Sequence, residues 1–204
     1  MSFPGVGLYA ITKTDNKTAD QVLADVSEAI KGGISVLQYR DKQPIDAVYL
    51  AGALKELCHA HNIPLIINDQ PELAKHIGAD GVHIGQEDSQ LTYAREVLGN
   101  KAMIGVSCYD SVELAIQAQQ LSADYVAFGR FFPSSSKPLA APAHMTTLQA
   151  AKKSIKLPIV AIGGILPDNG AQLLSAGADM LAVIGGIFTE SPYQSTLAYQ
   201  ALFK

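Results

Sequence analysis

The stretch Val36-Leu37-Gln38-Tyr39-Arg40-Asp41-Lys42 begins as an apolar strand and ends in polar and cationic side chains. Side chains alternate along a strand, so Gln38, Arg40 and Lys42 share one face, while Leu37 and Tyr39 take the other. An amide and two cations at the end of a strand suit an anion such as phosphate or pyrophosphate. A charged loop in water is the alternative, and the stretch by itself does not choose between the two.

Apolar segments of strand length recur along the whole chain. They are rich in Val, Ile, Leu or aromatic residues and are apolar nearly throughout instead of alternating, which is typical of strands buried on both faces of a parallel sheet. The predicted strands are residues 7–12, 35–40, 64–68, 81–84, 103–107, 125–129, 158–162 and 180–184.

Helical patterns fill the intervals between these strands. Thr18-Ala19-Asp20-Gln21 indicates a capping box, Gly32-Gly33 a helix end, and Pro44 a first helical position before a helix over 45–61. The other predicted helices are 71–77, 89–98, 111–121, 146–155, 168–176 and 192–202. This alternation predicts an α/β fold, a (β/α)8 TIM barrel, as a single domain over residues 1–204. No GxGxxG follows the first strand, which disfavours an open dinucleotide-binding sheet.

Composition narrows the class of protein. The chain is 48% hydrophobic and 17% charged, which is typical of a globular protein, and its net charge of −4 offers no basic field for nucleic acid. No leader pattern and no run of about 18 apolar residues is present, so we expect a cytoplasmic protein without a membrane partner. Cys58 and Cys108 are too few for a disulfide framework and are expected to be reduced thiols. A homo-oligomer is left open.

One internal repeat carries acidic residues. Gly78-Ala79-Asp80, Ser122-Ala123-Asp124 and Gly177-Ala178-Asp179 precede the fourth, sixth and eighth predicted strands. Helix-to-strand junctions lie at the N-terminal face of such a barrel, where residues usually serve stability. We therefore predict a structural role for the three aspartates.

The loops after the strands are where such a barrel builds its active site. Gly163-Gly164 and Gly185-Gly186 follow the seventh and eighth predicted strands, where bare backbone N–H groups can bind phosphate; tight turns are the alternative. Asp69 and Asp88 follow the third and fourth strands, and two carboxylates beside the cations of the second strand suit Mg2+ that bridges to phosphate. Capping of the following helix is a compatible alternative for each aspartate.

The remaining polar groups are less specific. Ser134-Ser135-Ser136-Lys137, after the sixth strand, predicts a second phosphate site or a cover over the barrel mouth, with a plain surface loop as the alternative. His59, His61 and His76 are expected to be structural. His83, within the fourth predicted strand, could reach the barrel mouth, but a buried histidine with hydrogen-bond partners is favoured. Two anion sites, one with Mg2+, and no covalent nucleophile favour a transferase that breaks a pyrophosphate ester.

Several motifs, in their order and spacing, make the chain resemble the thiamine-phosphate synthase family across nearly its full length. They are Gln38-Tyr39-Arg40-Asp41-Lys42, Ile67-Asn68-Asp69, Ala79-Asp80-Gly81-Val82-His83-Ile84-Gly85-Gln86-Glu87-Asp88, Gly105-Val106-Ser107, Tyr125-Val126-Ala127-Phe128-Gly129 and Ala161-Ile162-Gly163-Gly164-Ile165. The resemblance implies a (β/α)8 enzyme of thiamine biosynthesis. It would join hydroxymethylpyrimidine diphosphate to hydroxyethylthiazole phosphate, or its carboxylated form, and release pyrophosphate.

The resemblance also implies roles for individual residues. The pyrimidine diphosphate would lie among Gln38, Arg40, Lys42, Asn68, Ser107 and Lys137, with Arg40, Lys42, Ser107 and Lys137 catalytic. Asp69 and Asp88 would hold Mg2+, and Ser134, Ser136, Gly164, Ile184 and Gly185 would hold the thiazole phosphate. We add Tyr39, Asp41 and Ser135 to the predicted substrate-binding residues. In the implied mechanism pyrophosphate departs first, and the thiazole nitrogen captures the resulting pyrimidine methylene cation.

The chain departs from the family pattern at three places. Its serine loop stands where Thr-x-Thr-Lys is common, Tyr109 stands where many members have histidine, and residues 138–143 lack a frequent glycine. Two alternatives remain, a thiazole tautomerase of similar fold and a non-catalytic sensor of phosphate ligands. A tautomerase would not need the diphosphate site that Arg40, Lys42, Asp69 and Asp88 suggest.

Overall fold

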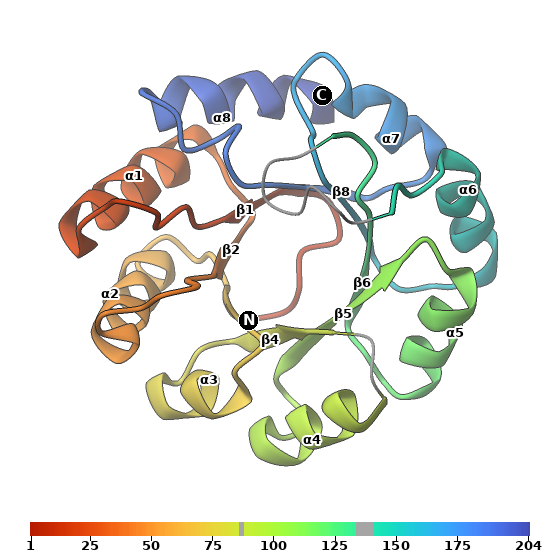
Figure 1. Ribbon diagram of the computed structural model, residues 1–204, viewed down its shortest axis with the longest axis horizontal. Helices are drawn as coiled ribbons and strands as arrows, with labels where there is room; N and C mark the ends of the chain where they lie inside the picture. Colours follow the sequence, from red (N-terminus) through yellow and green to blue (C-terminus); the bar gives the residue numbers. More distant parts are fainter. Residues whose placement is uncertain (86–87, 134–140) are drawn as a thin grey trace.

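The barrel predicted from the sequence is present. The computed structural model describes residues 1–85, 88–133 and 141–204, apart from the side chains of residues 88 and 89 (Figure 1). Within that part, eight parallel strands pair in sequence order and close into a barrel, with helices on the outside (Figure 1). The strands are β1 (Gly7–Ile11), β2 (Val36–Tyr39), β3 (Leu65–Asn68), β4 (Gly81–Ile84), β5 (Met103–Tyr109), β6 (Tyr125–Phe128), β7 (Ile159–Ile162) and β8 (Met180–Val183).

The helices agree closely with the predicted ranges. They are α1 (Ala19–Gly32), α2 (Ala47–His59), α3 (Pro71–Ile77), α4 (Asp88–Leu98), α5 (Val112–Gln120), α6 (Met145–Ser154), α7 (Gly170–Ala176), α8 (Pro192–Gln200) and the 3-10 turn η1 (Ala201–Phe203). The capping box at Thr18 is confirmed, because its side chain and that of Gln21 each accept a hydrogen bond from the other's backbone N–H. Among the described residues, every helix is too short or too polar to cross a bilayer.

The prediction that Pro44 begins the second helix was wrong. Helix α2 starts at Ala47, and the Asp46 side chain caps it by accepting a hydrogen bond from Tyr49 N. Ile45 lies outside the helix and is fully exposed. A carboxylate that accepts a hydrogen bond from an otherwise unpaired backbone N–H stabilises a helix start more than the fixed φ angle of proline does. The Asp46 cap therefore sets the start of α2.

Two apolar layers hold the barrel together. Residues that point outward from the strands, such as Leu37, pack against the helices, whereas alternate residues such as Val36 and Ile66 fill the interior. Near the N-terminus, Phe3 packs against the interior layer and stacks on Tyr125, with ring centroids 4.0 Å apart. The interior is therefore packed toward the N-terminal ends of the strands, which leaves the C-terminal ends for a site.

The two cysteines are free and buried in the outer layer, as expected for reduced thiols. Burial raises the pKa of Cys108 to about 12. Burial, with a smaller contribution from the charge of Asp80, raises the pKa of Cys58 to about 12. Since the thiolate is the reactive form, neither side chain is suited to act as a nucleophile.

The repeated aspartates are structural, as predicted. Each carboxylate precedes one strand and accepts a hydrogen bond from the start of the strand before it: Asp80 from Leu65 N at 2.9 Å, Asp124 from Ile104 N at 2.8 Å, and Asp179 from Ile159 N at 2.9 Å. Each also contacts a basic side chain, namely His59, Arg95 and Lys152 respectively. The repeat therefore joins neighbouring strands at the face away from the loops that build the site.

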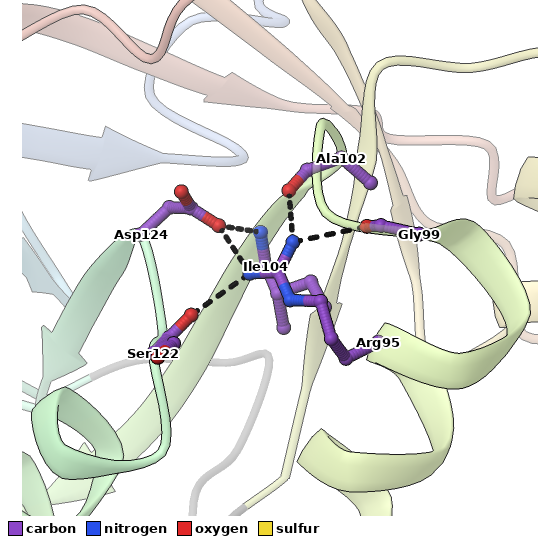
Figure 2. Close-up of polar contacts among 6 residues, drawn as sticks. All are labelled: Arg95, Gly99, Ala102, Ile104, Ser122 and Asp124. Atoms are coloured by element: carbon purple, nitrogen blue, oxygen red, sulfur yellow. Dashed lines mark hydrogen bonds and ion pairs between the residues drawn. The ribbon is translucent and has the colours of Figure 1, made fainter.

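Arg95 gives the middle member of this repeat further support. Figure 2 shows its guanidinium between the end of α4 and the start of β6, where it donates to the carbonyl oxygens of Gly99, Ala102 and Ser122 and to Asp124. The planar guanidinium has enough N–H groups to serve all four acceptors. One side chain thus connects the loop that leads into β5 with the loop that leads into β6.

Asp124→Ala should lower the free energy of unfolding by about 1–3 kcal/mol, because it leaves the N–H of Ile104 without its acceptor. Any catalytic activity of the folded protein should stay unchanged, since Asp124 lies at the face opposite the predicted site. Urea unfolding and initial rates measure the two effects. Asp124→Asn, which keeps an acceptor oxygen, is the matched control and should lose less. A catalytic loss with unchanged unfolding would contradict the structural role.

Candidate active site

A cavity of about 370 Å³ opens at the C-terminal ends of the strands. Its floor is formed by interior side chains of the barrel, and its rim by the loops after β6, β7 and β8. The polar side chains on its wall include Gln38, Arg40, Asn68, His83 and Ser107. A cavity of this size at this face of the fold is where a small ligand is expected.

Arg40 reaches this cavity because Thr12 holds the end of β2. The Thr12 hydroxyl donates to Arg40 O and accepts from Arg40 N, both at 2.9 Å, and Thr12 N donates to Gln38 O at 3.0 Å. Thr12 is buried, so these bonds compete little with water. The β1–β2 pairing is thereby extended past the strand ends, and the backbone of Arg40 has a fixed position.

A chain of hydrogen bonds crosses the floor of the cavity. Gln38 Nε2 donates to the Tyr9 hydroxyl at 2.9 Å, and the hydroxyls of Tyr9 and Tyr125 lie 2.8 Å apart. His83 Nδ1 lies 3.0 Å from the Tyr125 hydroxyl, and His83 Nε2 lies 2.9 Å from Ser107 Oγ. Burial raises the pKa of both tyrosine hydroxyls well above the ordinary value, so they remain protonated.

A second cavity, of about 230 Å³, lies beside the first and shares Arg40 and Asn68 with it. Its other lining residues come from the ends of β2 and β3: Tyr39, Asp41, Lys42, Ile67, Asp69 and Gln70. The Tyr39 side chain is buried, and its hydroxyl has no hydrogen-bond partner in the described part of the chain. Burial, then the charges of Asp41 and Asp46, raise the pKa of Tyr39 to about 12.

Asp69 is exposed in the second cavity in a left-handed backbone conformation, with φ of 59°. Its carboxylate accepts a hydrogen bond from Asn68 Nδ2 at 2.7 Å, and its N–H donates to His83 O at 2.8 Å. The capping role considered for it is not what the structure shows, since α3 has Gln70 at its N-cap and no side-chain hydrogen bond there. The carboxylate therefore faces a cavity that also has cations on its wall.

The glycines of the loops after β7 and β8 differ in how much space their backbone leaves for a side chain. Gly163 and Gly164 have φ of 106° and 62°, and an added Cβ would lie 2.2 Å from Arg130 Cβ and 2.3 Å from Pro133 O respectively. Close approach of the loop after β6 thus explains these two glycines. Gly185 is different, because nothing lies within 4 Å of where its Cβ would be. Its backbone is open to a ligand at the rim of the first cavity.

Asp110, directly after β5, ties that strand to the start of α6. Its carboxylate accepts hydrogen bonds from His144 N at 2.9 Å, His144 Nδ1 at 2.6 Å and Thr147 Oγ1 at 2.6 Å. Burial acts to raise the pKa of Asp110, but these hydrogen bonds and the charge of His144 outweigh it and hold the pKa below its usual value.

The stability advantage of the wild type over Asp110→Asn should depend on pH. The pKa of Asp110 is lower in the folded protein than in the unfolded chain, where it is about 3.9. The stability advantage is therefore complete at pH values above the pKa of the unfolded state, and it is lost as pH falls through the pKa of the folded state. Urea unfolding of both proteins between about pH 6 and pH 3 measures this. An advantage that stays constant over that range would contradict the lowered pKa.

Comparison with known proteins shows the family to which this chain belongs. A family model described as thiamine monophosphate synthase matches residues 8–187. A thiamine-phosphate synthase from Nitrosococcus oceani is 50% identical over 94% of this chain and 89% of its own length, and one from Azoarcus sp. is 46% identical over 97% of each. The chain belongs to the thiamine monophosphate synthase family. A solved thiamine phosphate pyrophosphorylase from Pyrococcus furiosus has a TM-score of 0.87 and 30% identity, with 97% of this chain and 95% of that chain covered.

These relatives confirm the resemblance on which the sequence-based hypothesis rested. All three carry the name of a synthase or pyrophosphorylase, so the tautomerase and sensor alternatives gain no support. As a member of the thiamine monophosphate synthase family, the protein is an enzyme of thiamine biosynthesis.

The structure brings most of the predicted site residues of this family member to the two cavities. Those that line the first are Gln38, Arg40, Asn68, Ser107, Gly164, Ile184 and Gly185, and those that line the second are Tyr39, Arg40, Asp41, Lys42, Asn68 and Asp69. Asp88 is the first residue of α4, and its side chain lies outside what the structure describes. Ser134, Ser135, Ser136 and Lys137 also lie outside the described residues.

Sequence reasoning missed several residues that the family member places at its site. His83 has the hydrogen-bond partners expected of it, but it lines the cavity at the barrel mouth, which was the less favoured of its two predicted places. Tyr9, Tyr125 and Thr12 were read only as strand residues, and Tyr109, to which no role was given, also lines the cavity. An apolar strand with a single tyrosine on its interior face is the signal that could have found Tyr9 and Tyr125. Thr12 does not line the cavity, and its role is to hold the Arg40 backbone.

Proposed function

We propose that this protein joins hydroxymethylpyrimidine diphosphate to hydroxyethylthiazole phosphate, or its carboxylated form, to give thiamine phosphate and pyrophosphate. The observation that carries the proposal is the pair of adjacent cavities that share Arg40 and Asn68. The first is large enough for a ring, and the second has a cationic side that suits a diphosphate. A substrate made of a ring and a diphosphate would fill both.

In the reaction, the bond between the pyrimidine methylene carbon and the diphosphate oxygen breaks, and a bond from the same carbon to the thiazole nitrogen forms. The oxygen that leaves gains negative charge as the first bond breaks. Arg40 and Lys42, on the wall of the second cavity, are suited to stabilise that charge, and Ser107 can donate a hydrogen bond from the first cavity. Gln38 and Asn68 would orient the substrate.

The thiazole phosphate is proposed to lie at the opposite rim. Gly164, Ile184 and Gly185 line the first cavity there, and the open backbone of Gly185 supports the approach of a phosphate. Ser134, Ser135, Ser136 and Lys137 stay predicted partners of the two phosphates. With the pyrimidine ring and the thiazole both bound in the first cavity, the thiazole nitrogen would be near the methylene carbon when pyrophosphate departs.

Mg2+ is the metal that these residues fit. The Asp69 carboxylate faces the second cavity next to the amide of Asn68, and hard oxygen donors with room for water suit this ion. Among the residues that the structure describes there is no cluster of three or more His, Cys, Asp or Glu. Asp69 and Asp88 would hold an ion that is completed by diphosphate oxygens and water, and when bound it would neutralise charge on the leaving group.

The experiment is direct. Purified protein with Mg2+, the pyrimidine diphosphate and the thiazole phosphate should release pyrophosphate and form thiamine phosphate at equal rates. Omission of either substrate is the control for thiamine phosphate formation. Absence of both products with fresh substrates would refute the proposal. A cytoplasmic location and a homo-oligomeric state stay predictions.

A further inference from the structure

The hydrogen-bond chain on the cavity floor includes two tyrosines that the proposed reaction leaves without a role. Tyr9 comes from β1 and Tyr125 from β6, and both are almost completely buried, with exposed fractions of 1% and 0%. Their hydroxyls connect Gln38, on β2, to His83, on β4, which in turn contacts Ser107, on β5. The two ends of the chain, Gln38 and Ser107, are both proposed to contact substrate.

We propose that Tyr9 and Tyr125 are positioning residues, whose hydroxyls impose one direction on the chain so that Gln38 offers its carbonyl oxygen, and Ser107 its hydroxyl proton, to the substrate. This inference rests on the proposed function, because that function supplies the substrate contacts. The direction itself is a property of the protein alone.

The direction follows from counting protons. Gln38 Nε2 donates to the Tyr9 hydroxyl, which has one proton of its own, and Tyr125 is the acceptor within reach at 2.8 Å. Tyr125 then donates its proton to His83 Nδ1, 3.0 Å away. A neutral histidine that accepts at Nδ1 carries its proton at Nε2, which donates to Ser107 Oγ at 2.9 Å.

The opposite direction is less favourable. The reverse chain would need the Gln38 amide turned so that Oε1 faces the Tyr9 hydroxyl, whereas the structure has Nε2 there, 2.9 Å away. With Nε2 in that place, donation from Tyr125 to Tyr9 would make the Tyr9 hydroxyl accept two hydrogen bonds, and its own proton would need another acceptor. Within the described residues, Tyr9 has no hydrogen-bond partner other than Gln38 and Tyr125. A buried donor without an acceptor is destabilising, so the direction from Gln38 to Ser107 is preferred.

Packing against neighbouring residues of the barrel fixes the position of the Tyr125 ring. Gly105 is its partner in the β5–β6 register, and a Cβ on Gly105 would lie 2.0 Å from Tyr125 Cζ, so the ring occupies the space that a larger residue would need. Phe3 stacks against the same ring, with an interplanar angle of 4°. The ring therefore has little freedom, and its hydroxyl has a fixed position between Tyr9 and His83.

The two ends of the chain should act at different stages of the reaction. With its nitrogen committed to Tyr9, Gln38 offers Oε1 to an N–H group of the ring, a contact that is present before and during bond breaking. Ser107, which accepts from His83, directs its proton to an oxygen of the diphosphate, whose charge grows as it leaves. The first contact should affect KM and the second kcat.

Two tyrosine variants separate these effects. Tyr9→Phe should raise KM for the pyrimidine diphosphate about fivefold with kcat nearly unchanged, the size expected for loss of one hydrogen bond. Tyr125→Phe should lower kcat about tenfold with KM nearly unchanged. Tyr93→Phe is the matched control, because that hydroxyl contacts Glu72 on the surface, and it should change neither constant.

Nitrogen NMR of histidine-labelled protein tests the direction without substrate or variant. At a pH of about 8, where an ordinary histidine is neutral, His83 should carry its proton on Nε2, with the signal identified by its loss in His83→Asn. The same tautomer should persist in Tyr9→Phe and give way to a mixture in Tyr125→Phe. A wild-type proton on Nδ1, or a Tyr125→Phe variant with unchanged tautomer and kcat, would overturn the inference. Absence of turnover in the wild type would refute the proposed function instead, and the NMR result would still decide the direction.

Discussion

Arg40→Ala should lower kcat by about a hundredfold or more, the cost usually found when a donor to a developing negative charge is removed. Arg40 lines both cavities, and two hydrogen bonds with the Thr12 hydroxyl, one donated and one accepted by it, hold the Arg40 backbone. A cation in this position should interact more strongly with departing pyrophosphate than with the intact substrate. The loss should therefore fall on kcat as well as on substrate binding.

Steady-state kinetics with varied pyrimidine diphosphate measures this. Arg40→Lys keeps the charge but not the planar pair of donors, so it should fall between alanine and the wild type. Lys75→Ala, an exposed cation on α3, is a control for loss of charge and should leave both constants unchanged. A rise in KM with unchanged kcat would reduce Arg40 to a substrate-binding residue.

Asp69→Asn should lower the rate about a hundredfold at ordinary Mg2+ concentrations and raise the Mg2+ concentration needed for half of the maximal rate. The substitution removes one negative charge and almost no volume. Asparagine tolerates the left-handed backbone that Asp69 adopts, so the thermal unfolding midpoint should change little. The expected loss is therefore catalytic and metal-dependent.

Rates measured over a range of Mg2+ concentrations, together with thermal unfolding, check this prediction. Asp124→Asn is the control, since it removes the same charge at the opposite face and should leave the Mg2+ requirement unchanged. Wild-type rates and Mg2+ dependence in Asp69→Asn would show that the carboxylate only supports the local turn through Asn68.

Much of the site followed from one rule, that the loops after the strands build it. The rule placed Arg40, Asn68 and Ser107 on one face, and the structure brings them to two cavities that share lining residues. It also separated the three repeated aspartates from the chemistry, and their hydrogen bonds to strand starts confirm that separation. These predictions succeeded because the polarity of a parallel barrel assigns each loop to a face before any side chain is placed.

The errors arose where local preference competes with a specific contact. Pro44 is a good first residue of a helix, yet Asp46 supplies the cap and begins α2 three residues later, at Ala47. The glycines of the loop after β7 were interpreted as a phosphate site, which stays a prediction; close packing against Arg130 and Pro133 is a second reason for glycine there that the local pattern does not contain. For the helix start and for this second reason, the deciding atom belongs to a neighbour whose position the local pattern does not contain.

Local sequence patterns were enough to predict the barrel and the face on which its site lies, because buried strands and amphipathic helices have characteristic periodicities and the chain direction assigns each loop to one face. The set of polar side chains that share the floor of the cavity is visible only in the three-dimensional structure. Tyr9 and Tyr125 are 116 residues apart, and their hydroxyls meet because closure of the barrel turns the interior faces of β1 and β6 toward each other. The stretch from Val36 to Lys42 shows both sides of this division: its alternation is local, but Thr12, Tyr9 and Asn68 decide what Gln38 and Arg40 can bind.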